Sequence, residues 1–206
     1  MNMTYSEQMF TTLSIFLKVF VCVIILHILY ISALFVFAGG LSGKNPFTYM
    51  KNQIPGYFTA LGTQSSAATI PINLECAKRN GTSPEIREFV VPLCATIHLA
   101  GSIITITSCV VTVLMMNNMA YDVTKVFPFI LVLGVAMVAA PGAPGGAIMS
   151  ALPFLGMVGI AANSPLASLL IALYITQDSF GTAANVSGDN AIAIIVDWIY
   201  HKFIKK

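Results

Sequence analysis

Long apolar segments with almost no charge dominate this sequence. Residues 19–37 (VFVCVIILHILYISALFVF) contain no Asp, Glu, Lys or Arg, and further apolar stretches follow them almost to the C-terminus. A helix of about 20 apolar residues is long enough to cross a bilayer. Only 9% of the residues are charged, whereas soluble proteins carry about 25%. The sequence therefore predicts an all-α polytopic membrane protein, and its formal charge of +2 is too small to indicate nucleic acid binding.

Positively charged residues set the predicted topology. Lys44 and Lys51 precede the stretch 54–77, and Lys78, Arg79 and Arg87 follow it. Because cytoplasmic loops collect Lys and Arg, both ends of this stretch belong on the cytoplasmic side. The stretch is therefore predicted to enter the membrane and turn back as a re-entrant hairpin. The basic C-terminus, HKFIKK, is also predicted to be cytoplasmic.

The loop charges and the number of membrane crossings also predict a second hairpin. The loop that holds Asp122 and Lys125 is short and neutral, which suits the outer side. One crossing must join this loop to the C-terminus, yet two apolar segments lie between them. The segment 126–162, which PGAPGG divides, is therefore predicted to be a hairpin entered from outside. The predicted organisation of residues 1–206 is a single transport core, with transmembrane helices at 10–41, 89–116 and 168–200 and re-entrant hairpins at 54–77 and 126–162.

Each predicted hairpin is followed by a long helix that polar residues interrupt, and the two units enter from opposite sides. The fold class is therefore an inverted repeat of a re-entrant helical hairpin plus a broken transmembrane helix. Inverted repeats with irregular backbone at mid-membrane depth are typical of secondary transporters, whose substrate and coupling ions bind there. Such backbone must be buried in protein or line a water-filled cavity. This architecture favours a transporter.

The last apolar segment contains the polar run QDSFGTAANVSGD. At about 100° per helical residue, Asp178, Thr182, Asn185 and Asp189 fall within about 60° of one another on one face. A charged residue at the bilayer centre costs at least about 2.5 kcal/mol, so an intramembrane carboxylate is by default a proton or cation site. The alternative is that the two aspartates cap helix ends or neutralise a distant lysine.

The order SSAATIP, a charged loop, ATIHLAGS, GAPGG and QDSFGTAANVSGD resembles the C-terminal half of the dicarboxylate/amino acid:cation symporter family. The resemblance extends from about residue 19 through nearly the whole chain. It implies a substrate site between the two hairpin tips and the two long helices, with the serines of the first tip on the substrate's α-carboxylate and Asp178 on its amino group. The residues implied to bind substrate are Ser65, Ser66, Ser102, Gly142, Ala143, Gly145, Asp178, Gly181, Thr182 and Asn185. The residues implied to couple an ion are Thr96, His98, Asn185 and Asp189, and residues 142–146 are implied to form the outer gate.

Two departures from the family pattern bear on substrate and ion. Members that carry acidic substrates have an arginine where this chain has Gly181, so glutamate and aspartate are not expected substrates. The family's sodium signature, asparagine–methionine–aspartate–glycine–threonine, is here HLAGS, with Ala100 in place of the aspartate. This change removes a carboxylate from the ion ligands and leaves Asp189, with the titratable His98, as candidates for proton coupling. HLAGS together with QDSFGTA is most similar to the L-cystine uptake branch of the family.

The predicted function is a secondary active symporter for L-cystine or another neutral amino acid, driven by a proton or cation gradient, and not an enzyme. The alternatives are a sodium-coupled serine/threonine-type or dicarboxylate symporter and a truncated remnant that does not transport. No cofactor or metal is predicted beyond the coupling ion, H⁺ or Na⁺. The expected partners are the amino-acid substrate, the bilayer and a missing N-terminal scaffold half, with a homotrimer in the complete protein. The expected location is the plasma membrane, multi-pass, with the C-terminus cytoplasmic.

Simpler interpretations of the same residues stay open. The Ser-Ser-Ala-Ala run suits close packing between helices, and GAPGG suits an ordinary loop. His98 would more often bind a neighbouring residue than a ligand, and Ser102 can bond back to its own helix. An intramembrane aspartyl protease would also use two aspartates, but its second motif requires glycine where Val186 stands, and Asp122 lies in a predicted loop.

Overall fold

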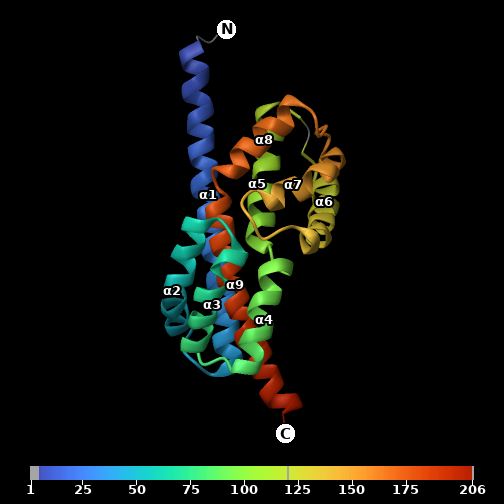
Figure 1. Ribbon diagram of the computed structural model, residues 1–206. Helices are drawn as coiled ribbons and strands as arrows, with labels where there is room; N and C mark the ends of the chain where they lie inside the picture. The colour runs from blue at the N-terminus through green and yellow to red at the C-terminus, as the bar shows by residue number, and fades with distance from the viewer. Residues whose placement is uncertain (1–4, 120, 206) are drawn as a thin grey trace.

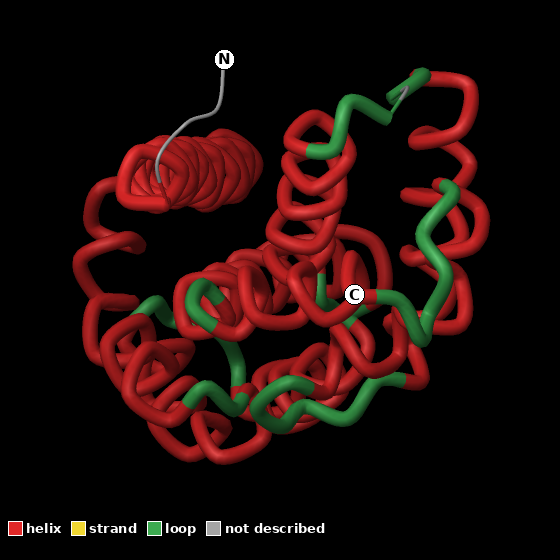
Figure 2. The backbone as a smooth tube through the Cα atoms, turned by 90° about the horizontal axis from the view of Figure 1, so that it is seen from above, coloured by secondary structure: helices red, strands yellow, loops and turns green. Residues whose placement is uncertain are grey.

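The computed structural model describes residues 5–119 and 121–205, and in these ranges the chain consists of helices joined by turns, with no strand (Figures 1 and 2). Helix α1 (Tyr5–Ser42) runs along the whole length of the molecule (Figure 1). Two helical stretches of the described residues, Leu13–Ser42 and Pro84–Met116, are long and apolar enough to cross a membrane. The prediction of an all-helical chain is confirmed for the described residues, and the two apolar stretches are consistent with the predicted membrane protein.

Helices α2 (Pro46–Thr63) and α3 (Ser66–Arg79) form a helical hairpin, called hairpin 1. Asn45 begins it as the N-cap of α2, where its side chain accepts a hydrogen bond from the Phe47 N–H and Pro46 occupies the first turn. The turn between the helices is only Gln64, in the left-handed region with φ 51°, and Ser65. The expected hairpin at 54–77 lies inside these bounds.

The next long helix is broken. Helix α4 (Pro84–Ile97) ends at His98, and α5 (Ala100–Met116) starts after Leu99, since neither of these two residues has helical dihedral angles. The break falls inside the stretch 89–116 that was expected as one polar-interrupted helix. It leaves the first N–H groups of α5 without partners in their own helix.

Hairpin 2 is less regular. Helix α6 (Val123–Ala136) continues into the short 3₁₀ helix η1 (Met137–Ala139), and the tip 140–145 leads to α7 (Gly146–Ala151) and a second 3₁₀ stretch, η2 (Leu152–Val158). Helix α8 (Pro165–Ile175) then meets α9 (Asp178–Ile199) at a turn formed by Thr176 and Gln177. The π-helical segment η3 (Tyr200–Ile204) extends α9.

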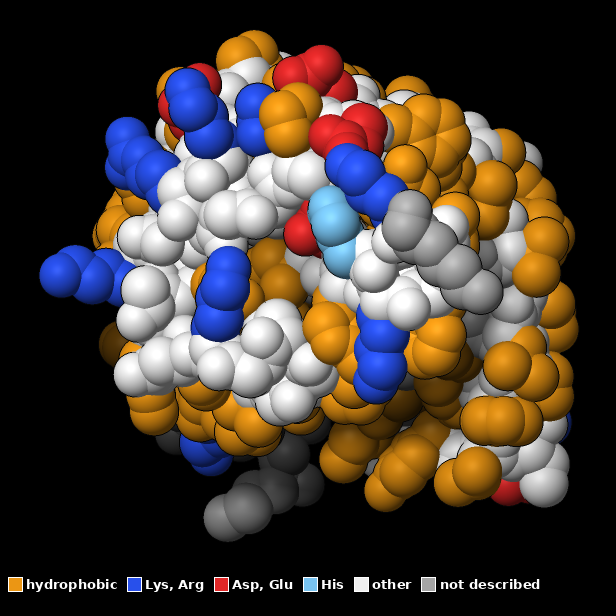
Figure 3. Space-filling view, turned by 90° about the horizontal axis from the view of Figure 1, so that it is seen from below, with side chains coloured by type: hydrophobic (Ala, Val, Ile, Leu, Met, Phe, Trp, Pro, Cys, Tyr) orange, Lys and Arg blue, Asp and Glu red, His pale blue; other side chains and the backbone are white. Residues whose placement is uncertain are grey.

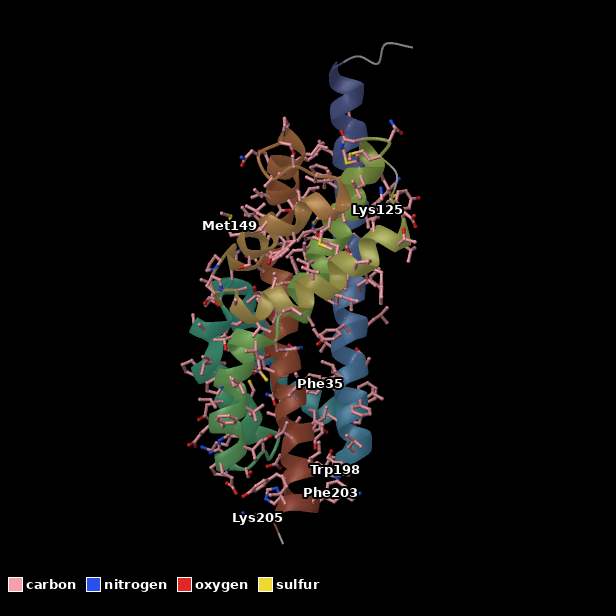
Figure 4. The ribbon with its side chains drawn as sticks, turned by 90° about the vertical axis from the view of Figure 1, so that its right-hand side faces the viewer. Phe35, Lys125, Met149, Trp198, Phe203 and Lys205 are labelled. Carbon is pink, nitrogen blue, oxygen red and sulfur yellow. The ribbon has the colours of Figure 1, made fainter. Side chains whose placement is uncertain are left out.

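Helix α9 is the centre of the fold, because it packs against α1, α2, α3, α4 and α5. Its residues 181–191 are all buried. Hairpin 1, α4 and most of α9 form one end of the molecule, whereas α5, hairpin 2 and α8 form the other, and α1 lies along one side of both (Figures 1 and 4). The order of hairpin followed by broken helix occurs twice in the described residues. Entry of the two hairpins from opposite membrane faces stays a prediction.

Candidate functional site

The tips of the two hairpins touch each other at the middle of the molecule. The hydroxyl of Ser65 donates a hydrogen bond of 2.6 Å to the carbonyl oxygen of Gly142, and the Ala67 N–H donates to the same oxygen at 3.3 Å. Gly142 permits this approach because a Cβ there would lie 2.9 Å from the carbonyl oxygen of Ala95 on α4. The serine hydroxyl also caps α3 by accepting from the Ala68 N–H. Ser65 therefore joins the two tips while it ends the turn of hairpin 1.

Asp178, the first residue of α9, binds the tip of hairpin 2 through its side-chain carboxylate. One of its carboxylate oxygens accepts from the Gly145 N–H at 2.8 Å, and the other accepts from the hydroxyl of Tyr174 on α8 at 2.7 Å. Both donors lie outside α9, so the carboxylate does not cap its own helix. The carboxylate is buried, with 4% of the residue exposed, and its two bonds connect hairpin 2 to the turn between α8 and α9.

A small cavity lies where the tips meet α5 and α9. Its volume of about 10 Å³ is close to the minimum that one water molecule needs. It is too small for an amino acid, so the tips are closed and would have to separate before a ligand of that size could enter. The lining residues are Gln64, Ser66, Leu99, Ser102, Pro141, Gly142, Ala143, Ala147, Tyr174, Asp178, Thr182 and Asn185. Most of the residues implied to bind substrate are therefore gathered here.

Gly181 lies at the edge of the same face of α9, beside Asn185 and against Gly101. A Cβ at this position would meet the Thr105 hydroxyl at 3.1 Å and backbone atoms of Gly101 at 3.5 Å. Its Cα thus faces α5, and Gly181 is not among the residues that line the cavity. The two glycines let α5 and α9 approach closely, which is the common use of small residues between membrane helices.

Asn185 connects α9 to the break between α4 and α5. Its side-chain oxygen accepts from the backbone N–H groups of Gly101 at 2.7 Å and Ser102 at 3.3 Å, and its amide nitrogen donates to the Ser102 hydroxyl at 2.9 Å. These N–H groups are the unpaired donors at the start of α5. Asn185 therefore fixes the broken helix as well as lining the cavity.

Asp189 and His98 form a buried pair one turn farther along α9. The Nδ1 atom of the histidine lies 2.8 Å from one carboxylate oxygen, and the Tyr30 hydroxyl on α1 lies 2.7 Å from its Nε2 atom. The aspartate is completely buried, and within the described part of the chain its second oxygen has no hydrogen-bond partner. A buried carboxylate requires a partner, a proton or a cation. The arrangement can accept any of these at the free oxygen.

Thr96 lies apart from this pair. Its side chain is exposed, and its hydroxyl donates to the Leu93 carbonyl in its own helix. Asp122 is also remote from Asp189, because it is an exposed N-cap of α6 that binds Thr124. The described residues include no group of three or more His, Cys, Asp or Glu side chains arranged to hold a metal ion.

Sequence reasoning missed a chain of buried amides between hairpin 1 and α9. The Gln53 amide donates to Asn73 at 3.0 Å and accepts from Asn190 at 2.6 Å, and Asn190 accepts from Asn80 at 3.3 Å. Asn73 donates in turn to the Val186 carbonyl on α9 at 3.0 Å. We call Gln53, Asn73, Asn80 and Asn190 the amide chain. The available signal was that polar residues inside apolar segments need partners.

Tyr30, Tyr174 and His27 were also missed, because nothing in an apolar helix shows which aromatic residue faces a polar site. The ring nitrogen Nε2 of His27 lies 3.0 Å from the Gly101 carbonyl oxygen. Helix α1 thus reaches the break between α4 and α5 with a histidine as well as a tyrosine.

Comparison of the sequence with known proteins shows the family of the chain. The sequence profile of the sodium:dicarboxylate symporter family matches residues 1–199. The chain is 32% identical to human excitatory amino acid transporter 2 over 159 residues, which are 77% of this chain and 27% of that protein. It is 30% identical to human excitatory amino acid transporter 5 over 183 residues, 88% of this chain and 32% of that protein.

Bovine neutral amino acid transporter A is 28% identical over 164 residues, 79% of this chain and 31% of that protein. The matched region therefore spans less than a third of the length of each of these relatives. The family and these relatives are transporters by description and not enzymes. Because the family profile matches almost the whole chain, this protein belongs to the sodium:dicarboxylate symporter family.

Proposed function

We propose that this chain is the substrate-binding core of a secondary active symporter that carries a neutral amino acid of the size of L-cystine, driven by a proton gradient. The observation that carries the coupling is the buried pair of Asp189 and His98, 2.8 Å apart and next to the closed tips. The pair can hold one proton between a fully buried carboxylate and a histidine side chain that is 15% exposed, and it adjoins the broken helix that Asn185 attaches to the cavity.

The substrate would take over hydrogen bonds that the closed tips now make. Its ammonium group would replace the Gly145 N–H on Asp178, and its α-carboxylate would meet the hydroxyls of Ser65 and Ser66. Occupying these groups would separate the second tip from Asp178 and then allow it to close again over the ligand. Ligand binding thereby shifts an equilibrium between open and closed tips.

A neutral side chain suits the cavity better than an acidic one. The described residues that line the cavity include no Lys or Arg. A guanidinium fork is the natural partner of a side-chain carboxylate. Gly181 supplies neither charge nor bulk, and a Cβ there would already lie 3.1 Å from the Thr105 hydroxyl on α5.

Sodium coupling is the second candidate, because the second oxygen of Asp189 is buried without a partner in the described part of the chain. Hard cations bind oxygen ligands, and such an oxygen suits one. The membrane arrangement that we propose has both hairpins re-entrant from opposite sides, the C-terminus cytoplasmic and the plasma membrane as the location. Further scaffold segments and a homotrimer would belong to a longer protein.

Calorimetric titration of L-cystine into the purified chain in lipid nanodiscs tests this proposal. Titrations at pH 7 in two buffers of different ionisation enthalpy, with sodium or with choline chloride, count the protons that are taken up. We expect about one proton per cystine without a need for sodium, and none in Asp189→Asn. Asp122→Asn, which alters an exposed carboxylate far from the site, should behave as the original chain. Binding that requires sodium and takes up no proton would establish the second candidate, and absence of binding to any amino acid would remove both.

The variant Gly181→Arg tests whether residue 181 packs against α5, as in the structure, or lines the substrate site, as the family resemblance implies. Since the side chain would enter the contact between α5 and α9, we expect lower thermal stability and no aspartate binding. A folded variant that gains aspartate affinity would instead place position 181 in the substrate site. One charge-assisted contact would then raise that affinity about 10- to 150-fold.

A further inference from the structure

A second pocket lies at the opposite end of the molecule from hairpin 2, near the C-terminus. Its volume is about 350 Å³, which is in the range of small-molecule sites. The view from below shows Lys and Arg side chains around this face and a hollow near its centre, beside a histidine (Figure 3). The walls come from the end of α1, the loop before α2, the loop between α3 and α4, and the end of α9. The lining residues are Ser42, Lys44, Tyr49, Asn80, Gly81, Thr82, Ile194, Asp197, Trp198, His201 and Lys202.

The charges of this pocket favour an anion. Lys44 and Lys202 line it together with His201, and Asp197 is the acidic residue of the lining. The Asp197 carboxylate already accepts from the backbone N–H of Ser83 at 3.0 Å and from its hydroxyl at 2.5 Å. The carboxylate is thus occupied by the start of α4, and His201, whose Nδ1 atom lies 3.5 Å from the same oxygen, is its partner on the C-terminal side. The ammonium groups of Lys44 and Lys202, in contrast, have no carboxylate partner of this kind in the described part of the chain.

Lys202, in η3, makes only a weak contact with its surroundings. The Lys202 Nζ atom lies 4.4 Å from the centre of the Trp198 ring, a cation–π contact that is weak where water reaches it. A charge-assisted bond to an anion contributes more. An anion in the pocket would therefore draw this ammonium group away from the indole ring.

Polar groups in the wall add hydrogen-bonding capacity. Thr82 is 3% exposed, and its hydroxyl has no hydrogen-bond partner among the residues that the structure describes. At another wall the Ser42 hydroxyl donates to the Ala38 carbonyl oxygen at 2.8 Å, and the Tyr49 hydroxyl lies 2.8 Å from the Ser42 oxygen, to which it donates; the Tyr49 proton could be redirected to a ligand. Buried hydroxyls without partners are costly unless a ligand or a water supplies one. Thr82 is one of the residues that line the pocket, so its hydroxyl is a candidate donor to a bound oxygen.

We propose that this pocket binds a phosphate group, carried either by the headgroup of an anionic phospholipid or by a small soluble phosphate ester. Two ammonium groups match the charge of a phosphate, and hydroxyls match its remaining oxygens. The apolar part of the lining, Ile194 and Trp198, suits the glycerol or acyl portion next to that phosphate, and tryptophan is a residue typical of the membrane interface. This site is separate from the cavity between the tips and does not depend on the transported substrate.

The sequence supplies a specific reporter, because Trp198 is the one tryptophan of the chain. The chain is placed in phosphatidylcholine nanodiscs, and its tryptophan emission is followed in three titrations. The first raises the fraction of phosphatidylglycerol, the second adds glycerol 3-phosphate, and the third adds sodium chloride to the same ionic strength. We expect a saturable change in emission in the first titration, the second or both, and a smaller, non-saturating change with chloride.

A variant at Lys44, compared with a control variant at Lys51, tests whether the change in emission comes from this pocket. Lys44→Gln should weaken the apparent affinity about tenfold, as expected for the loss of a charge-assisted contact. Lys51→Gln serves as the matched control, because this lysine lies near the same end of the molecule but outside the lining. Saturation with phosphatidylglycerol alone would identify a lipid site, and saturation with glycerol 3-phosphate would identify recognition of the phosphate itself. No saturable change in either titration, or equal affinity in Lys44→Gln and the original chain, would overturn the proposal.

Discussion

Hairpin 1 and hairpin 2 have similar positions in the repeated order of the chain but are held by different forces. Hairpin 1 is attached to α9 by the amide chain, in which buried side chains such as Gln53 and Asn190 hydrogen-bond directly. Hairpin 2 packs with apolar side chains, among them Phe129, Leu133 and Leu155, which are completely buried. Its tip is six residues long, whereas the turn of hairpin 1 has two.

The difference matters because lipid is as apolar as the side chains of hairpin 2. Inside a membrane there is little hydrophobic gain from helix contact, so hydrogen bonds and close packing decide which elements stay together. Hairpin 1 has specific polar bonds that are lost if it moves. Hairpin 2 can exchange apolar contacts for others of similar energy, so we expect it to move more readily. The four predictions below test this contrast, in order of decreasing effect.

The largest effect is expected from breaking the amide chain. Asn190→Leu removes the partners of both Gln53 and Asn80. Leaving these groups buried and unpaired should lower the free energy of unfolding by about 2 kcal/mol. Unfolding with sodium dodecyl sulfate, followed by Trp198 fluorescence, measures the change. Asn117→Leu is the control, because the side chain of Asn117 bonds to Val113 within its own helix; equal losses in the two variants would refute the special role of the amide chain.

The second prediction concerns the close contact of the two tips. Gly142→Val places a side chain against Ala95 and Ala67 and should hold hairpin 2 away from hairpin 1. The rate at which a water-soluble thiol reagent labels the lining position Thr182→Cys, in a Cys22→Ser background, should rise about tenfold, as for an opening equilibrium shifted by about 1.4 kcal/mol.

The control for Gly142→Val is a valine substitution in hairpin 1, at Gly62. A Cβ at Gly62 meets no atom within 4 Å, so Gly62→Val should leave the labelling rate of the cavity unchanged. If the Gly142 variant labels as slowly as the original chain, the tips do not restrict access.

A smaller opening is expected when the side-chain hydrogen bond between the tips is removed. Ser65→Ala leaves the Gly142 carbonyl oxygen with the Ala67 N–H alone, at 3.3 Å, and also removes the side-chain cap of α3. Loss of a net contribution of about 1 kcal/mol should raise labelling at Thr182→Cys about fivefold. Ser65→Thr, which keeps the hydroxyl, should be close to the original chain. A threonine variant that opens as far as the alanine variant would show that the methyl group, not the bond, controls the tips.

The smallest expected effect is a difference in pH dependence between the N-caps of the two hairpins. Asn45 caps α2 with an amide, whereas Asp122 caps α6 with a carboxylate. Hydrogen bonds from Thr124, with a minor contribution from Lys125, hold the pKa of Asp122 below its usual value. The stabilisation is present above the unfolded-state pKa of about 3.9 and is lost as the pH falls through the lower folded value.

Hydrogen exchange of backbone amides can measure this loss. After correction for the intrinsic rate, exchange in the first turn of α6 should accelerate slightly below about pH 4, and exchange in the first turn of α2 should not. Asp122→Asn keeps a capping side chain without the titration and should remove the acceleration. Equal acceleration at both helices would mean that another group is responsible.

Much of the site could be predicted from residue order, because Asp178, Thr182, Asn185 and Asp189 share one helical face by periodicity alone. Residue order could not show which residues of other helices oppose that face. Tyr30 and Tyr174 come from α1 and α8, and Gly181 turned out to contact α5 and not to line the cavity. These pairings depend on how helices rotate against each other, which a one-dimensional pattern does not contain.

The sequence by itself determined that the chain is helical and suited to a membrane, because segment length and apolar composition are local properties. It also showed the order in which proline, glycine and polar residues interrupt the apolar segments, but not where the helices break: the expected helices 89–116 and 168–200 are divided at residues 98–99 and 176–177, whereas Pro55 and Pro71 lie inside continuous helices. Only the tertiary structure decided that the tips are closed over a cavity of about 10 Å³, that His98 meets Asp189, and that hairpin 1 is tied to α9 by amides. These are contacts between residues as many as 137 positions apart, and their energies exist only once the helices have packed.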